Sequence, residues 1–443
     1  MTSSLPWAGR RLHFVGIGGA GMSGLALVAR ALGADVTGSD RAVTSSYAQR
    51  LRDAGIEPVA GHDAANVPAG AELVVSTAIE AANPERVVAR ERGLVELHRG
   101  ELLGELTRLK PTIAVAGTHG KTTTSSMVVH ALRGCGLDPS YLVGGEVRST
   151  HTNAAWTDGE WLVVETDESD RSLLELAPRV AVLTNAELDH HTTYASQREV
   201  DATFRAFLAL AETAVVWDRP ALIGLVPPEV ETIAFDVASP ELGPAGSAFE
   251  FDGIQVELPV PGAHNARNAA AALAACRSAG ADIEVAARAL RDFSGAGRRF
   301  ERLGRTPAGA EVVDDYAHHP TEVRATLEAA RTLAPRRVVA IFQPHLFSRT
   351  HRHAAEFGAA LALADVVVVS EIYAARERAE DHPGVTGRLV AAHAADHAGG
   401  RLVAWLPRLD QAEAFVRSIL REGDLVLTLG AGDVDTVARR LVA

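Results

Sequence analysis

A glycine-bounded turn followed by a lysine has the layout of a loop that binds nucleotide phosphates. An apolar run at 113–116 leads into a turn at 117–120, then Lys121 and three threonines, and a helical segment follows. The glycines let backbone N–H groups approach phosphate oxygens, and the helix N-terminus adds partial positive charge. We therefore predict that Lys121 contacts the outer phosphates and that the Thr122 hydroxyl binds magnesium. The usual motif has glycine where this chain has Val115, so an ordinary strand–helix turn is the alternative.

Lysine is scarce in this chain. Lys110 and Lys121 are its only lysines, and the rest of the Lys+Arg total of 43 is arginine. A compact ammonium on a flexible stem cannot be exchanged freely for a planar guanidinium. The retention of lysine at 121 therefore favours a chemical role for this residue.

Carboxylates and a histidine follow two buried strands downstream of this turn. The strand at 161–164 ends in a run of four acidic residues that starts at Glu165, and the strand at 180–185 leads to His190. Magnesium keeps several waters and takes one or two carboxylates, so a carboxylate at a strand end beside a phosphate loop is a natural ligand. We predict Glu165 as a magnesium ligand and His190 as a metal ligand or a phosphate donor. The alternatives are a solvated acidic loop and a structural histidine.

A second glycine-rich turn lies near the N-terminus. The strand at 12–15 runs into Gly-x-Gly-x-x-Gly at 16–21, and a helix of small residues follows. The next strand ends at Asp40, about 20 residues later, as in dinucleotide-binding domains. A further strand at 73–79 has polar residues at its carboxyl end, where ligands of open α/β sheets bind. We predict a diphosphate-containing ligand here. A nicotinamide cofactor and a glycine-rich packing turn are the alternatives.

The rest of the chain adds polar groups at further strand and helix ends. Polar side chains at 261–268 precede an alanine-rich helix expected from Ala269, where they could hold a base or ribose, although capping would explain the asparagines equally well. Strands ending near 312–320 and 338–350 carry histidines, a tyrosine and an arginine, which suit a carboxylate-bearing partner. An ATP-dependent ligase acting on a nucleotide-carried substrate accounts for both loops and for these groups together.

Strands rich in Val, Ile and Leu alternate with helices throughout, which predicts parallel sheets covered on both faces. We expect an α/β protein of three domains, at 1–107, 108–296 and 297–443. The first and last are Rossmann-like, and the central one resembles a P-loop ATPase with a small β insertion at 213–260. A net charge of −13 disfavours non-specific binding to nucleic acid or to anionic membranes. Two cysteines and the absence of 18 unbroken apolar residues predict a cytoplasmic protein without a signal peptide or membrane span.

These motifs together resemble those of the Mur ligase family. The N-terminal stretch 13–24 and the loop Gly-Thr-x-Gly-Lys-Thr-Thr at 117–123 match family signatures, and the loop match explains Val115. Further matches follow in order along essentially the whole chain, at 165–170, 185–190, 264–268, 314–320, 342–350 and 430–433.

The resemblance implies an activity in peptidoglycan precursor synthesis, and hence in cell-wall biogenesis, cell shape and cell division. ATP would phosphorylate the lactyl carboxylate of UDP-N-acetylmuramate, and L-alanine would attack the resulting acyl phosphate. The implied small-molecule partners are UDP-N-acetylmuramate, L-alanine, ATP and Mg²⁺, and the implied assembly is a monomer or a homodimer. The third domain would close over ATP and exclude water.

The resemblance also assigns roles to individual residues. The catalytic and metal-binding residues it implies are Lys121, Thr122, Glu165 and His190. The ATP-binding residues it implies are Gly117, Thr118, His119, Gly120, Lys121, Thr122, Thr123, His264, Asn265, Asn268, Arg298, Arg299 and Asp315. The substrate-binding residues it implies are Gly16, Gly18, Gly19, Ser39, Asp40, Ser76 and Ala78 for the UDP part, and Tyr316, His318, His345 and Arg349 for the muramyl and alanine side.

Some features depart from the family pattern. Relatives that add later amino acids use a carbamylated lysine to bridge metals, and this chain has no lysine after Lys121, which favours the alanine-adding activity. Ala317 stands where the family often has glycine, and neither His191 nor the stretch 376–382 has a role in this scheme. The main alternative is a recycling ligase that attaches a preformed peptide to the same UDP sugar. A nicotinamide-dependent oxidoreductase leaves the lysine loop unexplained, and a non-catalytic sensor leaves the acidic ligands unexplained.

Overall fold

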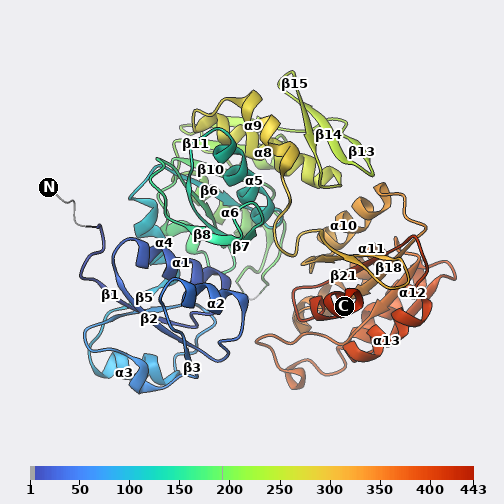
Figure 1. The fold of residues 1–443 in the computed structure, drawn as a ribbon, viewed down its shortest axis with the longest axis horizontal. Helices are drawn as coiled ribbons and strands as arrows, with labels where there is room; N and C mark the ends of the chain where they lie inside the picture. Colours follow the sequence, from blue (N-terminus) through green and yellow to red (C-terminus); the bar gives the residue numbers. More distant parts are fainter. Residues whose placement is uncertain (1–4, 192) are drawn as a thin grey trace. The chain divides into compact units, whose positions relative to one another are not determined.

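The computed structural model describes residues 5–191 and 193–443, and its described part forms two compact units (Figure 1). The first unit comprises residues up to 236 together with 268–290, and the second comprises 237–267 and 291–443. In the described part of the chain, no helix is both long and apolar enough to span a bilayer.

The first unit begins with a five-stranded, fully parallel sheet in the order β3-β2-β1-β4-β5. Adjacent residues along its central strands enter different cores: Phe14 packs into one hydrophobic cluster, while Val15 packs into another. Both faces are therefore covered, as expected for a parallel sheet. The strands are β1 Arg11–Val15, β2 Asp35–Asp40, β3 Val59–Ala60, β4 Glu72–Val75 and β5 Glu96–His98; the helices are α1 Ala20–Ala31, α2 Ser46–Asp53, α3 Pro84–Glu91 and α4 Arg99–Thr107.

A seven-stranded sheet in the order β12-β11-β10-β6-β9-β7-β8 follows in the same unit, parallel except for the β7–β8 pair. Its central strand β6 is fully buried and leads into the lysine loop. From Asn268 onward, helix α8 belongs to this unit. The strands are β6 Thr112–Ala116, β7 Ser140–Val147, β8 Thr152–Ala155, β9 Leu162–Glu165, β10 Val180–Leu183, β11 Thr213–Trp217 and β12 Glu231–Phe235; the helices are α5 Lys121–Gly134, α6 Gln197–Leu208, α7 Pro220–Ile223, α8 Ala263–Ser278 and α9 Ile283–Ala289.

The predicted β insertion at 213–260 is wrong in its first half. Strands β11 and β12 extend the parallel sheet, and only 241–258 form a separate antiparallel sheet, which belongs to the second unit. Strand β12 is the edge of its sheet and is largely exposed, so its sequence lacks the apolar run of a buried parallel strand. Asp252 and Gly253 both adopt positive φ between paired Phe251 and Ile254, the geometry of a two-residue hairpin turn. The strands are β13 Glu241–Gly243, β14 Gly246–Phe251 and β15 Ile254–Leu258.

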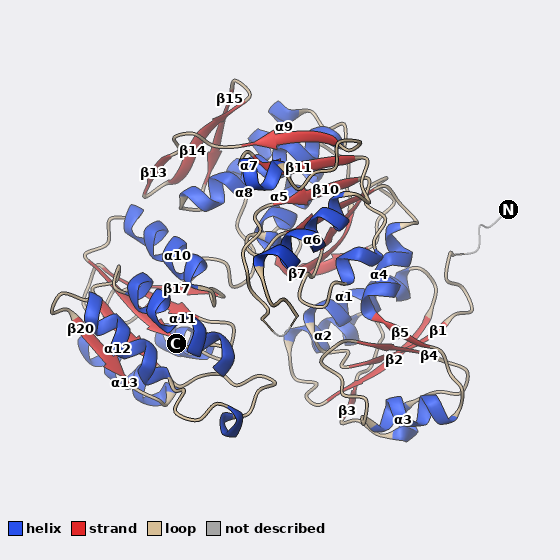
Figure 2. Ribbon diagram, turned by 180° about the vertical axis from the view of Figure 1, so that it is seen from behind, coloured by secondary structure: helices blue, strands red, loops and turns tan. Residues whose placement is uncertain are grey.

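The main sheet of the second unit has six strands in the order β16-β17-β21-β18-β19-β20 (Figure 2). Only the edge strand β16 is antiparallel to its neighbour. Two hydrophobic clusters cover its two faces: one contains Val313 and Ala340, the other Val312 and Val339. The strands are β16 Glu301–Arg305, β17 Glu311–Asp315, β18 Arg337–Phe342, β19 Val366–Val369, β20 Leu402–Trp405 and β21 Asp424–Leu429; the helices are α10 Pro320–Thr332, α11 Phe347–Leu361, α12 Gly387–His397, α13 Leu409–Ile419 and α14 Asp435–Val442.

Candidate active site

The lysine loop forms the connection between β6 and α5 that the sequence predicts. Its two glycines adopt positive φ, 131° at Gly117 and 82° at Gly120. A Cβ atom at Gly117 would lie 2.1 Å from the Thr184 hydroxyl, and one at Gly120 would lie 2.6 Å from Asn268 Oδ1. Both positions therefore require glycine, because a side chain would be strained and would collide. Val115 needs no such freedom, since it is a buried strand residue before the turn.

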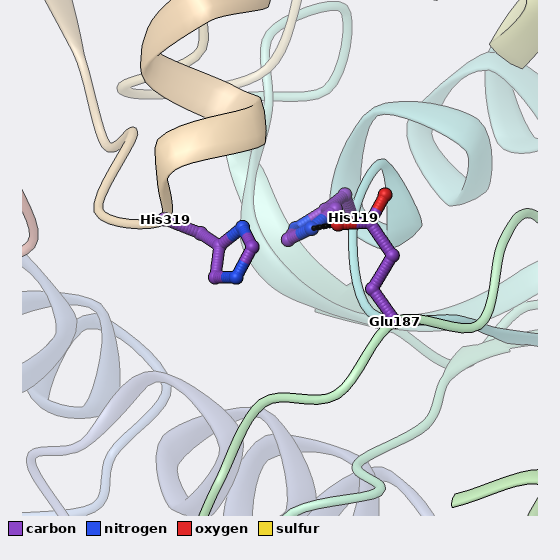
Figure 3. A group of neighbouring side chains, drawn as sticks. All are labelled: His119, Glu187 and His319. Carbon is purple, nitrogen blue, oxygen red and sulfur yellow. Dashed lines mark hydrogen bonds and ion pairs between the residues drawn. The ribbon is translucent and has the colours of Figure 1, made fainter. Parts of the chain in front are cut away.

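Residues after β10 hold this loop in shape. Asn185 accepts the His119 N–H at 2.9 Å and donates to the His119 carbonyl at 2.9 Å. Thr118 exchanges two hydrogen bonds with the backbone of Glu187, at 3.0 and 2.9 Å. The His119 ring lies 3.3 Å from the Glu187 carboxylate, an interaction drawn in Figure 3. The loop is thus fixed by neighbouring side chains.

The Lys121 ammonium is enclosed by oxygen atoms. It donates to the Gly117 carbonyl at 2.6 Å and to the Thr118 carbonyl at 3.2 Å, and it lies 3.0 and 2.9 Å from the two carboxylate oxygens of Glu168. Burial opposes the charged form, but the Glu168 carboxylate outweighs it and raises the pKa of Lys121. Glu168 belongs to the acidic run that starts at Glu165, and no role is predicted for it from the sequence. Its place in that run is the only sequence feature that points to the site.

Thr122 and Glu165 come together as the magnesium prediction requires. The Thr122 hydroxyl donates to Glu165 Oε1 at 2.9 Å, while the Gly144 N–H donates to Oε2 at 2.6 Å. A Cβ atom at Gly144 would lie 2.7 Å from the carboxylate, so glycine is needed for this approach. A hydroxyl and a carboxylate side by side form a hard oxygen donor pair at the start of α5, which fits Mg²⁺.

His190 lies in the same region, beside a different carboxylate. Its Nε2 is 3.4 Å from Glu168 Oε1 and 3.8 Å from Asp189 Oδ2. Its backbone adopts φ 50°, and its N–H donates to Asp189 Oδ1 at 2.7 Å. The structure therefore places His190 next to Glu168, which in turn holds Lys121.

Arg99 joins the acidic run to the first sheet. This first residue of α4 pairs with Asp167 and with Asp170, whose Oδ2 lies 2.9 Å from Arg99 Nη2. Burial would raise the pKa of Asp167, but Arg99, the hydrogen bonds from Ser169 and the charge of Lys121 together outweigh it and lower that pKa. A Cβ atom at Gly21 would lie 3.2 Å from the same guanidinium. The N-terminal glycine turn and the acidic run are therefore neighbours within the first unit.

The N-terminal glycine turn is closed by Asp40. The Gly18 N–H donates to Asp40 Oδ2 at 2.8 Å, and the N–H groups of Gly16 and Ile17 donate to the Ser39 carbonyl at 2.8 and 3.0 Å. The Ser39 hydroxyl is fully buried and donates to Glu85 at 2.7 Å. The structure thus brings the Asp40 carboxylate, predicted to bind the UDP part, onto the glycine turn, and it directs the Ser39 hydroxyl into the protein.

Three further residues of the predicted UDP site are Gly19, Ser76 and Ala78. They lie beside the glycine turn along the chain or after the end of the neighbouring strand β4. Gly19 precedes α1 directly, where free N–H groups of a helix start are available. Ser76 follows the carboxyl end of β4 and is half-buried, while Ala78 is exposed. Both stand at the edge where ligands of open parallel sheets bind.

The residues at 264–268 lie inside a helix, and this corrects the expected helix start at Ala269. Helix α8 already begins at Ala263, after Gly262 with φ 101°. Asn265 donates to the Pro261 carbonyl at 2.8 Å. In the first unit, Asn268 faces Gly120 of the lysine loop. In the second unit, the His264 ring packs against Gly262.

The predicted ATP-side residues of the second unit are held in a tight network. Arg298 donates to Asp314 at 2.9 Å and to the Gly430 carbonyl at 2.9 Å. The carboxylate of Asp315 accepts the backbone N–H groups of Phe300 and Ala317, both at 2.8 Å. Burial raises the pKa of Asp315 to about 6, although Arg299 nearby opposes the shift. These two side chains, Arg298 and Asp315, hold the strand ends of this unit together.

Aromatic rings gather beside these strand ends. Arg298 and Arg299 lie over the Tyr316 ring, at 5.1 and 4.9 Å from its centroid. The ring of His345 lies between His318 and Tyr373, with centroid distances of 5.9 and 5.8 Å.

Buried Arg349 lies 3.2 Å from Nδ1 of His345. Both residues are predicted to contact the muramyl and alanine part of the substrate, and they are neighbours in this unit. Sequence reasoning missed Tyr373. It follows β19, but nothing in its local pattern predicts a bridge back to His345.

Comparison with known proteins places this architecture in a family. Three family models match consecutive parts of the chain: the Mur ligase family, catalytic domain, over residues 11–111; the Mur ligase middle domain over 115–276; and the Mur ligase, glutamate ligase domain, over 298–432. A UDP-N-acetylmuramate–L-alanine ligase of Kineococcus radiotolerans is 46% identical over 96% of this chain and 94% of that protein. Another from Mycolicibacterium smegmatis is 44% identical over 99% and 96%. The chain belongs to the Mur ligase family.

Solved structures agree with this assignment. The crystal structure of a UDP-N-acetylmuramate-alanine ligase from Thermotoga maritima matches with a TM-score of 0.84 and 30% identity, covering 98% of both chains. A murein peptide ligase from Psychrobacter arcticus matches with a TM-score of 0.73 and 26% identity, also over 98% of both chains. The architecture of three main sheets and one small antiparallel sheet described above is thus that of the family.

Proposed function

We propose that this chain is a UDP-N-acetylmuramate–L-alanine ligase that uses ATP and Mg²⁺ in peptidoglycan precursor synthesis. Near full-length similarity to ligases with this name supports the proposal. The structural observation that carries it is the convergence of Lys121, Thr122 and Glu165 at one loop. These groups suit phosphoryl transfer, whereas an oxidoreductase would have no use for them.

The reaction consists of two transfers. The terminal phosphoryl group of ATP passes to the lactyl carboxylate of UDP-N-acetylmuramate, giving ADP and an acyl phosphate. The amine of L-alanine then attacks the acyl carbon, and the tetrahedral intermediate collapses to the amide with loss of phosphate. Phosphoryl transfer depends mainly on positioning and charge stabilisation, so the chain must supply cations and N–H donors at fixed places.

Residues of the first unit supply these groups. The N–H groups of the loop at 117–120 and the start of α5 surround the phosphates, and the Lys121 ammonium neutralises charge on the transferring group. Thr122 and Glu165 would hold Mg²⁺, which would add charge neutralisation, and His190 would serve a second metal near the carboxylate. Asn268, beside Gly120, lies on the nucleotide side of the loop.

The diphosphate of UDP binds at the start of α1, which the N-terminal glycine turn presents without a side-chain cap. Asp40 fixes the turn, and the edge beside Ser76 and Ala78 accommodates the rest of the nucleotide. In the second unit, Tyr316, His318, His345 and Arg349 form a cationic and aromatic surface for the muramyl and alanine part. Asp315 and Arg298 keep this surface in shape for Arg299 and Tyr316.

One assay tests this proposal. Phosphate release from ATP is measured with UDP-N-acetylmuramate and, singly, L-alanine, glycine, L-serine or the tripeptide. We expect turnover with L-alanine. Turnover only with the tripeptide would establish the recycling activity instead, and no turnover with any amine acceptor would favour a sensor.

A further inference from the structure

Glu168 lies between two residues of the proposed nucleotide site without belonging to the set that binds nucleotide or metal. Its carboxylate is 2.9 Å from the Lys121 ammonium and 3.4 Å from Nε2 of His190. Its side chain is only 4% exposed, so the charge has little access to water. A buried carboxylate in this position must interact with whichever charged group approaches Lys121.

The hydrogen-bonding capacity of Lys121 is fully used by oxygen atoms of the protein. An ammonium has three N–H donors, and here they meet Gly117, Thr118 and Glu168. Two of these partners are backbone carbonyls of the loop, which neighbouring side chains hold in place. A terminal phosphate can therefore reach Lys121 only by replacing the Glu168 carboxylate.

The main chain around Glu168 is fixed, so the displacement is a side-chain rotation. The Glu168 carbonyl accepts the Tyr194 hydroxyl at 2.6 Å and the Arg171 N–H at 3.1 Å. The following residue, Ser169, accepts the Thr193 hydroxyl at 2.6 Å through its carbonyl. After leaving Lys121, the carboxylate still has His190 as a neighbour.

We propose that the Glu168 carboxylate competes with the terminal phosphate of ATP for the Lys121 ammonium. This inference rests on the proposed function, because it takes the lysine loop as the ATP site. The carboxylate and the phosphate cannot accept the same N–H of Lys121, so Glu168 lowers nucleotide affinity.

The charge-removing variant Glu168→Gln tests this competition. In this variant Lys121 is buried without the Glu168 counter-charge, which destabilises the protein. A bound phosphate supplies a new counter-charge and removes this cost. We expect Glu168→Gln to bind a non-hydrolysable ATP analogue about tenfold more tightly than the wild type, by calorimetry, with a smaller gain for ADP. General structural damage would weaken binding, so a gain in affinity separates the two explanations.

Three further variants complete the test. Glu175→Gln removes an exposed carboxylate of the same unit and is expected to leave affinity unchanged. Glu168→Asp retracts the carboxylate and is expected to give an intermediate gain, which keeps the test usable if the Gln variant does not fold. In a Lys121→Gln background, Glu168→Gln is expected to give no gain, since there is no ammonium to compete for.

The outcomes separate this inference from the proposed function. If the wild type fails to bind the analogue, or if Lys121→Gln binds it equally well, both are overturned. If the wild type binds and Lys121→Gln weakens binding, the proposed site holds. In that case, unchanged or weaker binding by both Glu168 variants overturns the role of Glu168. A gain that persists without Lys121 overturns it too, because repulsion alone would then explain the effect.

Discussion

The two glycine-rich turns of the first unit share a backbone plan but differ in the charges around them. Each follows a buried strand, has a positive-φ glycine near its start and precedes a helix, α1 or α5. The N-terminal turn is closed on itself by Asp40, and the central turn is packed with Lys121, Glu168, Thr122 and Glu165. Backbone N–H groups suffice to bind a diphosphate that does not react. A phosphoryl group in transfer needs charges placed for the transition state.

The comparison makes a general prediction about kinetics. Damage to the central turn should reduce kcat, because its groups act on the reacting phosphoryl group. Damage to the N-terminal turn should raise KM for the UDP sugar and leave kcat nearly intact.

Lys121→Arg should produce the largest effect. The ammonium fits between two carbonyls and a carboxylate, and a planar guanidinium cannot meet the same three partners. We expect phosphate release to fall by roughly 10²–10³ or more, while calorimetry still detects binding of UDP-N-acetylmuramate. Turnover near the wild-type rate would remove Lys121 from the transfer step.

Glu85→Gln should give the next largest effect, on stability under acid conditions. Glu85 is fully buried beneath the N-terminal turn. Burial would raise its pKa, but the His13 ring and hydrogen bonds from Ser39 and Asn66 lower that pKa to about 2. A carboxyl group whose pKa is lowered in the folded state stabilises the protein at pH values above its ordinary pKa of 4.5. This stabilisation is lost as the pH falls towards 2.

Between pH 6 and pH 3, the free energy needed to open the N-terminal sheet should therefore fall by about 2 kcal/mol more in the wild type than in Glu85→Gln. Hydrogen exchange of β1 and β2, corrected for intrinsic rates, measures this difference. Parallel pH profiles for the two proteins would show that Glu85 is not the group responsible.

Much of this contrast could be predicted from the sequence, because glycines and buried strands leave strong local signals. The contact of Asp40 with the N-terminal turn and that of Thr122 with Glu165 follow from strand ends meeting at one sheet edge. The role of Glu168 could not be predicted. Three acidic residues follow β9, and only the folded chain determines which of them faces Lys121.

The errors also have physical causes. Helix α8 starts six residues earlier than its alanine run, because polar side chains in its first turns resemble a loop in sequence. The prediction that β12 belongs to an insertion is wrong, because an exposed edge strand lacks the continuous apolar pattern of its buried neighbours. In both cases packing against the rest of the fold determines the structure, and the local sequence pattern alone does not.

Asp40→Asn should have a moderate effect confined to substrate binding. The amide can still accept from Gly18, but without charge the turn is held less firmly. We expect KM for UDP-N-acetylmuramate to rise about tenfold, with kcat within about twofold of the wild type. Steady-state kinetics with ATP saturating distinguish the two constants. A fall in kcat with unchanged KM would break the proposed division between the two turns.

Lys110→Arg should have the smallest effect and provides the matched control for Lys121→Arg. Like Lys121, Lys110 has three oxygen partners, at 3.0, 2.7 and 2.6 Å on Ser140, Thr157 and Gly159, and it also lies 4.5 Å from the centroid of the Trp156 ring. None of these oxygens is a carboxylate, and none belongs to either glycine turn. A guanidinium there disturbs packing, so we expect a cost of about 1 kcal/mol in stability and turnover within about twofold of the wild type.

If lysine were retained at both positions only because an ammonium fits a small oxygen-lined space, the two Arg variants would lose activity alike. If Lys121 acts on the transferring phosphoryl group, only its variant loses turnover, and both lose some stability. Thermal unfolding and phosphate release measured on the two variants side by side therefore separate the geometric reason for keeping a lysine from the chemical one.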